Sequence, residues 1–357
     1  MKIYNTGLSD MQQARVLIDE DLKRFIDGWR ATFDQGSADG LEAYCQIVLR
    51  GGKRLRGILA MQSYYAHGGT DDIVAIGVAR VLELVQAYLL VLDDIFDRSD
   101  TRRGGPSAHR IVQSAAVRKK MRGDTAHYGE AQVVSAAQSG AHIAALELLR
   151  LPVADAAIRR ALMSLHKNIE ITGKGQMNDI YNEATNEQLN EAAIERVLTQ
   201  KSAYYTFVNP LELGACLAGC EMLDVNLHQY ALHTGCAFQI TDDLIGTFGA
   251  TTETGKSTND DIREGKMTLI AQYALAHANE ADQQMLRSIL GNVTASDEEC
   301  DEARRIMLAT GAREYAIERA HSYATKARQA LANQTSLDPE FLSFLGQLID
   351  YVRTRQA

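Results

Sequence analysis

The sequence predicts an all-α fold that forms a single large domain over residues 1–357. Proline, which breaks helices, occurs only four times in the 357 residues. Residues that favour helices, such as alanine, leucine and glutamate, are frequent, and no Pro/Gly/Ser-rich linker divides the chain. Hydrophobic residues make up 46% of the sequence. That content is enough for one large core, because a chain of this size buries about three quarters of its unfolded surface.

Predicted helices follow one another along the whole chain, and one of them is marked by a clear apolar repeat. Apolar residues at positions 82, 85, 89 and 92 recur at helical spacing, so this helix has a buried face. The longest predicted loop is Thr247–Gly265, and long loops in compact domains are often functional lids. The segments predicted to be mainly helical are 8–34, 39–50, 56–67, 71–97, 107–121, 128–149, 154–173, 187–218, 222–248, 266–278, 281–291, 297–331 and 337–355.

Three carboxylates lie at the end of the predicted helix 71–97, at Asp93, Asp94 and Asp97. Positions four apart share a helix face, so Asp93 and Asp97 project together, and Gln86 joins that face. Like charges this close repel each other unless a cation neutralises them. Mg²⁺ prefers oxygen ligands and is usually bound by a few carboxylates together with substrate phosphates. One such cluster alone is equally typical of a solvated helix end.

A second acidic cluster, Asp242 and Asp243, lies on the predicted helix 222–248 and precedes Lys256 and Lys266. Lysines on such a segment can meet phosphate oxygens while the segment closes over a bound diphosphate and excludes water. Two paired acidic clusters can hold several divalent ions around one polyanion. The two clusters together therefore predict diphosphate chemistry.

Basic residues gather in two further segments. One of these, Gly51–Gly57, places three cations beside glycine backbone: Lys53, Arg54 and Arg56. Taken alone, it is also typical of a solvated helix start. The other contains Arg102 and Arg103, followed by Gly-Gly-Pro, a sequence typical of a turn that interrupts a helix. Both segments offer cations to an anionic substrate.

Composition excludes several classes of protein. The net charge of −9 argues against a general nucleic-acid-binding role. Five scattered cysteines suit a reducing compartment, and Cys216 with Cys220 is better explained as two small buried residues than as a zinc site. The N-terminal sequence has no apolar signal core, and no run approaches the roughly 18 apolar residues of a membrane span. The sequence therefore predicts a soluble, cytoplasmic protein without an integral membrane segment.

The order of these motifs resembles that of the trans-isoprenyl diphosphate synthases, the polyprenyl synthetase family. The resemblance covers roughly residues 45–270 and rests on GGKRLR, Gln86, DDIFD, RRG, Gly175-Gln176, Lys201-Ser202-Ala203, FQITDD, Gly255-Lys256 and Lys266. It implies a helical bundle of the isoprenoid synthase type with a central active-site cavity. It also implies condensation of isopentenyl diphosphate with an allylic diphosphate, head to tail and in trans, with three Mg²⁺ ions per active site. A homodimer is implied as well, with the helix leading to Asp93 near the interface.

The resemblance implies roles for individual positions. Residues matching those that bind the diphosphate of isopentenyl diphosphate are Lys53, Arg56, Gln86 and Arg103. Residues matching Mg²⁺ ligands are Asp93, Asp94 and Asp97 for two ions, and Asp242 with support from Asp243 for the third. Residues matching those that hold the allylic diphosphate are Arg102, Lys201 and Lys266, with Lys256 as a lysine of the closing loop. Those that face the developing allylic cation are Gln239 and the backbone near Lys201 and Ser202.

Three positions depart from the family pattern. Gly246 stands where the family commonly has the last aspartate of the second acidic motif, so a lower metal affinity is expected. Asn259 occupies a usual glycine position in the closing loop, and Ser202 replaces a more common threonine while keeping the hydroxyl. Segment 133–143 also lacks a Gly-Asp pair often seen there. These departures keep a non-catalytic regulatory subunit as an alternative.

Product length depends on the residues one turn before the first acidic cluster. Leu89 lies about 6 Å before Asp93 along the helix, on nearly the same face, and Tyr88 is next to it. In the family, bulky aromatics at both positions stop growth near C15, whereas an aromatic followed by a smaller residue admits C20. Tyr88-Leu89 therefore favours geranylgeranyl diphosphate, with farnesyl diphosphate as the alternative. Both side chains also suit simple packing in the core.

Two other enzyme classes with helical bundles fit the sequence less well. A carboxylate-bridged di-metal bundle needs two Glu-x-x-His pairs, and the sequence offers Glu318 and His321 as a lone instance. A terpene cyclase needs only the acidic sites. The complete GGKRLR and RRG segments, which suit a second diphosphate, favour chain elongation instead.

Overall fold

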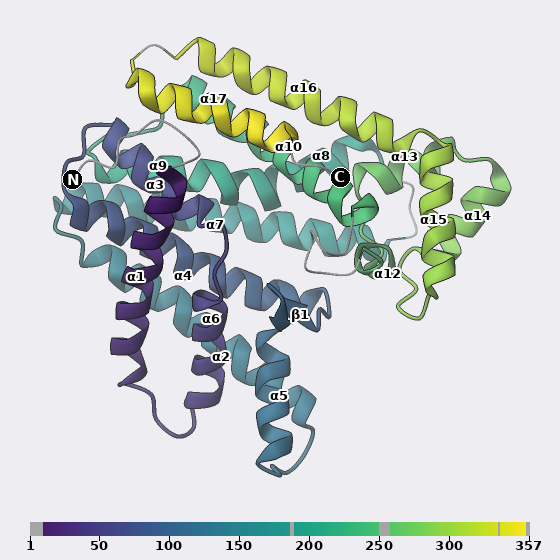
Figure 1. Ribbon diagram of the computed structural model, residues 1–357, viewed down its shortest axis with the longest axis horizontal. Coiled ribbons are helices and arrows are strands. Elements are labelled where there is room, and N and C mark those ends of the chain that lie inside the picture. Colours follow the sequence, from purple (N-terminus) through teal and green to yellow (C-terminus); the bar gives the residue numbers. More distant parts are fainter. Residues whose placement is uncertain (1–9, 186–188, 250–257, 335, 355–357) are drawn as a thin grey trace. The chain divides into compact units, whose positions relative to one another are not determined.

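The computed structural model describes residues 10–185, 189–249, 258–334 and 336–354 (Figure 1). The all-α prediction is confirmed, because the strands in this part of the chain are only two residues long each: β1 (Thr101–Arg102) and β2 (Gly105–Pro106). The chain divides into two compact units, described separately below. Unit 1 comprises residues 1–163 with 210–222, and unit 2 comprises residues 164–209 with 223–357. The expectation of a single domain over residues 1–357 stays a prediction.

Unit 1 is built around helix α4, which packs against α1, α2, α3, α5 and α6. Asp71 caps α4 by accepting a hydrogen bond from the Ile73 amide, and the helix then runs to the first acidic cluster. The predicted apolar face is buried at Leu82 and Val85, whereas Leu89 and Leu92 remain partly exposed. The helices of this unit are α1 (Asp10–Arg30), α2 (Ala38–Leu49), α3 (Leu55–Ala66), α4 (Asp72–Phe96), α5 (Ala108–Arg118), α6 (Thr125–Leu149), and parts of α7 (Asp155–Ala184) and α9 (Asn209–Leu217).

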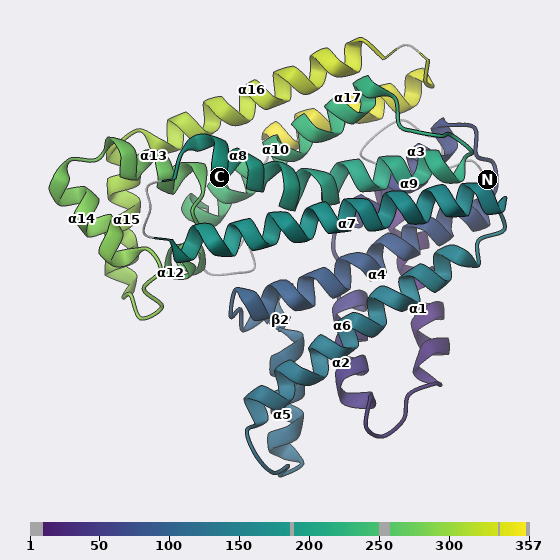
Figure 2. The ribbon, with the colours of Figure 1, turned by 180° about the vertical axis from the view of Figure 1, so that it is seen from behind.

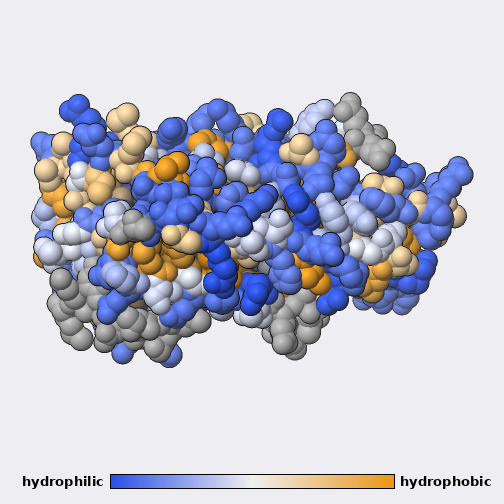
Figure 3. Space-filling model, turned by 90° about the horizontal axis from the view of Figure 1, so that it is seen from above, coloured by the Kyte–Doolittle hydropathy of each residue, from blue (hydrophilic) through white to orange (hydrophobic). Residues whose placement is uncertain are grey.

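Helix α4 corrects one expectation about membrane segments. Its most apolar 18-residue window has a mean hydropathy of 1.8, so by length and composition alone the helix is able to cross a membrane. However, 67% of that window is buried inside the protein, as in the core helix of a soluble protein. The face drawn in Figure 3 is mostly hydrophilic, with apolar patches interrupted by polar side chains. A single buried helix of this kind does not indicate a membrane protein.

Unit 2 is built around helix α10, which packs against α16, α17 and the π-helix η1. Figures 1 and 2 show α10, α16 and α17 side by side. Asp224 caps α10 by accepting hydrogen bonds from the amides of Asn226 and Leu227. The elements of this unit, besides the rest of α7, are α8 (Glu191–Val197), η1 (Leu198–Val208), α10 (Val225–Phe248), α12 (Asp260–Glu264), α13 (Leu269–His277), α14 (Glu280–Ile289), α15 (Asp297–Ala309), α16 (Ala312–Ala332) and α17 (Pro339–Thr354).

Three predicted helical segments differ from the structure in their ends or divisions. Helix α7 continues to Ala184 rather than ending at residue 173, because Gly175 does not end it but allows close packing: a Cβ there would overlap the Lys201 backbone. The single helix predicted over 187–218 is divided into α8, η1 and α9. The helix predicted over 297–331 is broken before α16 at Gly311, whose φ of 78° is left-handed.

Candidate functional site

The first acidic cluster lies at the end of α4 and is tied to Arg102. Asp94 is fully buried, and its Oδ1 accepts a hydrogen bond of 2.7 Å from Arg102 Nε and an ion pair from Arg102 Nη2. Asp93 Oδ2 lies 3.6 Å from the same guanidinium. Burial acts to lower the pKa of Arg102, but Asp94, Asp93 and Asp97 together outweigh it, and the pKa is raised. Asp97, partly exposed, follows the last residue of the helix and donates its amide to Asp93 O at 2.8 Å.

Arg102 and Arg103 belong to a small β-hairpin that the sequence did not predict. In the hairpin, β1 pairs with β2 so that Thr101 faces Pro106 and Arg102 faces Gly105. The two turn residues, Arg103 and Gly104, have φ of 51° and 72°, as in the two-residue turns that match strand twist. Glycine adopts this conformation freely, whereas arginine does so at a cost. The hairpin folds the backbone sharply and so turns Arg102 toward α4.

Arg50 holds this hairpin in place, and sequence reasoning missed it. Its Nη1 donates to Arg102 O at 3.0 Å and to Pro106 O at 2.6 Å. A side chain at Gly105 would meet the Arg50 guanidinium at 2.9 Å, so the glycine is needed for this approach. Burial lowers the pKa of Arg50, although Asp94 acts in the opposite direction. Its position just before the GGKRLR motif was the available signal.

The basic segment divides into one buried structural arginine and two cations that reach solvent. Arg54, with a left-handed φ of 52°, is buried and donates to Glu83 at 2.9 Å, to Asp19 at 2.7 Å and to Val48 O at 2.8 Å. Lys53 is exposed and Arg56 is partly exposed. Arg54 was predicted only as one of three cations. The signal that distinguishes it is Glu83, a carboxylate inside an otherwise apolar stretch.

Arg103 lies against the same basic segment. Its Nη1 donates to Ile47 O at 3.2 Å, and a Cβ at Gly52 would lie 3.1 Å from its Nη2. Gln86, Tyr88 and Leu89 are partly exposed on α4. Burial raises the pKa of the Tyr88 hydroxyl. Unit 1 thus brings the hairpin and the GGKRLR loop together, while the roles of Tyr88 and Leu89 stay predictions.

In unit 2, the π-helix η1 presents Lys201 and Ser202. Lys201 Nζ donates to Asp179 Oδ2 of α7 at 2.6 Å. Ser202 Oγ donates to Gln239 Oε1 at 2.8 Å, and Gln239 Nε2 donates to Asp243 Oδ1 at 2.9 Å. Three predicted residues are therefore linked in one hydrogen-bonded chain. Single-turn π segments within helices often mark functional sites, and this one is a longer stretch that no propensity pattern predicted.

The second acidic cluster carries an excess of negative charge. Burial raises the pKa of Asp243 to about 7. The carboxylates of Asp261 and Asp242 raise this pKa further, whereas the hydrogen bond from Gln239 and the charge of Lys266 act to lower it. Lys266 Nζ lies 3.1 Å from Asp261 Oδ1 and 3.0 Å from Glu264 Oε2. Sequence reasoning missed Asp179, Asp261 and Glu264. Asp261 and Glu264 fall within the predicted loop, where their charge gave no periodic signal.

The acidic side chains suit a cation that arrives with its substrate. Among the described residues, no group of three or more His, Cys, Asp or Glu side chains forms a ready metal-binding cage. Mg²⁺ needs only one or two carboxylates when substrate phosphates complete its shell. The donors are hard oxygens, and a bound cation would favour the charged form of Asp243, whose pKa is raised by burial and, to a lesser degree, by neighbouring carboxylates. The residues present therefore fit Mg²⁺.

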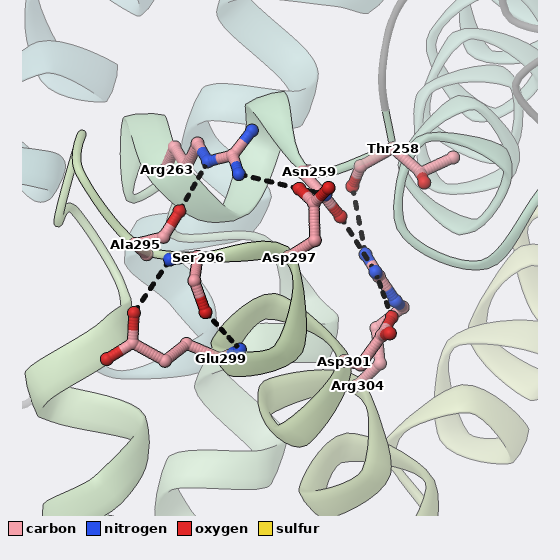
Figure 4. A network of polar contacts seen from close by, with 9 residues as sticks. All are labelled: Thr258, Asn259, Arg263, Ala295, Ser296, Asp297, Glu299, Asp301 and Arg304. Atoms are coloured by element: carbon pink, nitrogen blue, oxygen red, sulfur yellow. Dashed lines mark hydrogen bonds and ion pairs between the residues drawn. The ribbon is translucent and has the colours of Figure 1, made fainter.

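The loop predicted to close over the site is only partly described. Lys256 lies outside the described residues, as does Gly255. Helix α10 continues to Phe248, and the short helix α12 occupies Asp260–Glu264. Asn259, which precedes α12, has an ordinary φ of −84° and donates to Asp297 Oδ1 at 2.6 Å, while Arg304 Nη2 donates to Asn259 Oδ1 at 2.7 Å (Figure 4). The departure from glycine at this position therefore adds an anchor to α15.

A pocket of about 430 Å³ lies in unit 2. Side chains from α7, α8, η1 and α16 line it, and Glu195 within it accepts a hydrogen bond of 2.6 Å from Tyr323. None of the predicted site residues lines this pocket. The acidic and basic clusters are therefore better candidates for the functional site than this pocket.

Comparisons with known proteins agree on one family. Residues 39–307 match the family model described as Polyprenyl synthetase. The chain is 28% identical over 335 residues to a geranylfarnesyl diphosphate synthase from Aeropyrum pernix, over 92% of this chain and 99% of that protein. It is 28% identical over 287 residues to an octaprenyl diphosphate synthase from Haemophilus influenzae, over 80% of this chain and 79% of that protein. A crystal structure of a geranylgeranyl pyrophosphate synthase from Corynebacterium glutamicum, complexed with isoprenyl diphosphate and magnesium, is 29% identical with a TM-score of 0.89, over 96% of this chain and 98% of that one.

Proposed function

The chain belongs to the polyprenyl synthetase family, and from this premise we propose that it condenses isopentenyl diphosphate with an allylic diphosphate, head to tail and in trans. It is an enzyme, a trans-prenyltransferase. The observation that carries the proposal is the close pairing of cations with each acidic cluster: Arg102 with Asp93 and Asp94, and Lys266 with Asp261 near Asp243. Such mixed clusters can bind a diphosphate through cations and its metal ions through carboxylates.

Unit 1 provides the cations for isopentenyl diphosphate. Lys53, Arg56, Gln86 and Arg103 are the proposed ligands of its diphosphate, and all four reach solvent at least in part. Arg54 is not a ligand, because its guanidinium is buried on Glu83 and Asp19. Its role is to hold the end of the loop with Lys53 and the start of α3 with Arg56 onto α4. A guanidinium binds phosphate oxygens through two parallel hydrogen bonds, which favours arginine here.

Ionisation of the allylic C–O bond places negative charge on the leaving diphosphate and positive charge on the hydrocarbon. Arg102, Lys201, Lys256 and Lys266 are the proposed ligands of the leaving diphosphate and stabilise its charge. Gln239 and the backbone near Lys201 and Ser202 are the proposed polar groups facing the allylic cation. The alkene of isopentenyl diphosphate then attacks, and its proton passes to the released diphosphate. No protein nucleophile takes part.

The proposed metal ligands are Asp93, Asp94, Asp97, Asp242 and Asp243, with three Mg²⁺ ions per site. Bound Mg²⁺ supplies Lewis-acid stabilisation of the leaving diphosphate. Asp94 has a second function, since it orients the Arg102 guanidinium. Magnesium in the related Corynebacterium glutamicum structure supports divalent metal use in this family. The number of ions is part of the proposal.

The proposed product is geranylgeranyl diphosphate. Tyr88 and Leu89 are partly exposed on α4 about one turn before Asp93, which leaves their side chains open to contact with a substrate tail. The matched relatives range from geranylgeranyl and geranylfarnesyl to octaprenyl diphosphate synthases, so family membership alone leaves product length open. Farnesyl diphosphate is the alternative product. A homodimer and a cytoplasmic location complete the proposal.

A product-length assay tests this function directly. The purified protein is incubated with Mg²⁺, labelled isopentenyl diphosphate and, separately, C5, C10 and C15 allylic diphosphates, and the dephosphorylated products are resolved by length. We expect products that end at C20. A Leu89→Phe variant should shorten the product to C15, while the exposed Leu146→Phe variant on α6 serves as the matched control and should leave it unchanged.

The outcomes separate the alternatives. Products ending at C15 in the wild type keep the enzyme but contradict the role of Tyr88 and Leu89. Products beyond C20 contradict the proposed floor in the other direction. No product with any starter, from protein shown to be folded, favours a non-catalytic regulatory subunit.

A further inference from the structure

The turn between α5 and α6 carries a dense cluster of exposed cations. Figures 1 and 2 show this turn at an outer end of unit 1. Two apolar side chains accompany the cations and are also exposed, Val117 at 58% and Met121 at 39%. We name residues 117–122 the basic tip. Its cations occupy four of five consecutive positions in a chain whose net charge is −9: Arg118, Lys119, Lys120 and Arg122.

The backbone at the end of α5 holds these side chains in a defined turn. The Lys120 amide donates to Val117 O and the Met121 amide donates to Ala116 O, each at 3.0 Å, which is the pattern of a Schellman C-cap. The left-handed residue of this motif is usually glycine, whereas here it is Lys120, with a φ of 52°. A side chain in that conformation destabilises the turn relative to glycine. The stability of the turn therefore does not explain a lysine at position 120.

Little acidic charge neutralises the basic tip. Lys119 Nζ is bound to both carboxylate oxygens of Asp39, at 2.7 and 2.8 Å, which ties the tip to the first turn of α2. Asp124, the next acid along the chain, caps α6 by accepting two backbone amides. Within the part of the chain that the structure describes, three cations of the tip have no ion-pair partner and are open to an external anion: Arg118, Lys120 and Arg122.

The mixture of charge and apolar side chains favours a lipid bilayer over a soluble polyanion. Basic clusters on amphipathic helices bind anionic bilayers, with their apolar side chains at the level of the headgroups. Helix α5 is amphipathic, since Val112 and Ala116 are buried whereas Val117 is exposed. A phosphate backbone requires only the cations. Because the protein as a whole is acidic, an anionic surface repels most of it and favours contact at the tip.

We propose that the basic tip docks the protein onto an anionic membrane surface. Lipid phosphates pair with Arg118, Lys120 and Arg122, while Val117 and Met121 enter the headgroup layer. The contact is peripheral and involves no membrane-spanning segment. It goes beyond the proposed function and does not depend on catalysis. A prenyl diphosphate, the proposed product, is itself an anionic lipid, so docking would also place that product beside a bilayer able to take it up.

Sedimentation with lipid vesicles tests the docking without turnover. The folded protein is mixed with vesicles of phosphatidylcholine alone or of equal parts phosphatidylcholine and phosphatidylglycerol, and the bound fraction is measured against lipid concentration. We expect binding only to the vesicles that contain phosphatidylglycerol, and weaker binding at high salt because the charges are screened. Absence of such binding by the wild type would overturn the inference and leave the proposed function untouched.

The first variant removes the three open charges of the tip: Arg118→Gln, Lys120→Gln and Arg122→Gln. Each cation near an anionic bilayer strengthens binding about fivefold, so the triple variant should bind about 100-fold more weakly. A matched control makes the same change in net charge at three exposed cations on separate helices: Lys23→Gln, Lys167→Gln and Arg287→Gln. An equal loss in both triple variants would show that net charge sets the binding, and the inference would be wrong.

Two further variants separate docking from stability and from charge. Lys120→Gly supplies the usual residue of a Schellman cap, so the melting temperature should stay equal or rise while vesicle binding falls about fivefold. Val117→Ser with Met121→Ser should weaken vesicle binding about tenfold, because apolar contact is lost. Binding of this double variant to inorganic polyphosphate, which has no apolar layer, should not change. Wild-type vesicle binding by either variant, or tighter binding of the tip to polyphosphate or duplex DNA than to vesicles, would overturn the inference.

Discussion

At the scale of single residues, the neighbouring cations of the GGKRLR motif differ in burial. Arg54 is buried with Glu83, and the exposed fraction of each side chain is 1%. Lys53, its neighbour, is exposed. A buried ion pair contributes little net stability, but removing one partner leaves an uncompensated buried charge. Burial therefore separates adjacent cations of one motif into a structural residue, Arg54, and a solvent-exposed lysine that can reach a substrate.

Arg54→Met should lower the free energy of unfolding by about 3–5 kcal/mol, because Glu83 is left buried without its partner. The double variant Arg54→Met with Glu83→Gln removes both charges and should recover much of that loss. Denaturant titration monitored by circular dichroism measures both. Equal stability of Arg54→Met and the wild type would show that the pair does not hold the GGKRLR loop.

His109 should make unit 1 sensitive to mild acid. Burial and, to a lesser degree, Arg110 lower the pKa of His109 from 6.5, although Glu130 and Asp100 act in the opposite direction. Its Nδ1 lies 3.3 Å from Ser107 Oγ. Between the lowered pKa and 6.5 the unfolded chain binds a proton that the folded chain does not, so stability falls as the pH drops below about 6.5.

His109→Gln should flatten this dependence, and the exposed His142→Gln variant on α6 is the control. Urea midpoints measured from pH 7.5 to pH 5 give the slope for each protein. An unchanged slope in His109→Gln would assign the acid sensitivity to other groups.

At the scale of elements, local geometry decides where the chemistry lies. The β-hairpin Thr101–Pro106 turns Arg102 back onto α4, and the π-helix η1 presents Lys201 to Asp179 and Ser202 to Gln239. The RRGG sequence predicted a chain break but not paired strands, since two-residue strands carry no periodic pattern. The π-helix could not be predicted from the sequence either, because its residues have ordinary helix propensities.

Arg50→Met should loosen the hairpin and thereby the position of Arg102. The loss of two hydrogen bonds from a charged donor should cost about 1.5–3 kcal/mol of stability and reduce kcat/KM for the prenyl transfer about tenfold, since small displacements of a catalytic cation are costly. Arg150→Met is the matched control, because the side chain of Arg150 is 66% exposed in its pair with Glu147. If kcat/KM falls equally in both variants, Arg50 has no special part in positioning Arg102.

At the scale of the whole molecule, ligand binding should be visible in stability. A ligand that binds only the folded protein stabilises it by about 2.7 kcal/mol at a concentration 100 times its Kd. Mg²⁺ with pyrophosphate should therefore raise the melting temperature by a few degrees, and either component alone should raise it less. Calorimetric scans with EDTA in place of Mg²⁺ provide the control. Equal melting temperatures under all four conditions would contradict metal-dependent diphosphate binding.

Helix propensity, apolar spacing and charged motifs are local properties, so the all-α class, most helix positions and the candidate acidic and basic residues could be predicted from the chain alone. The burial of Arg54 on Glu83, the contact of Arg50 with the hairpin and the contact of Asp261 with Gly246 became visible in the folded protein. The physical reason is that burial and contact join residues far apart in the chain. Gly246 shows the difference most clearly: in the sequence it is a missing carboxylate, and in the folded protein it is the space that a carboxylate from α12 occupies.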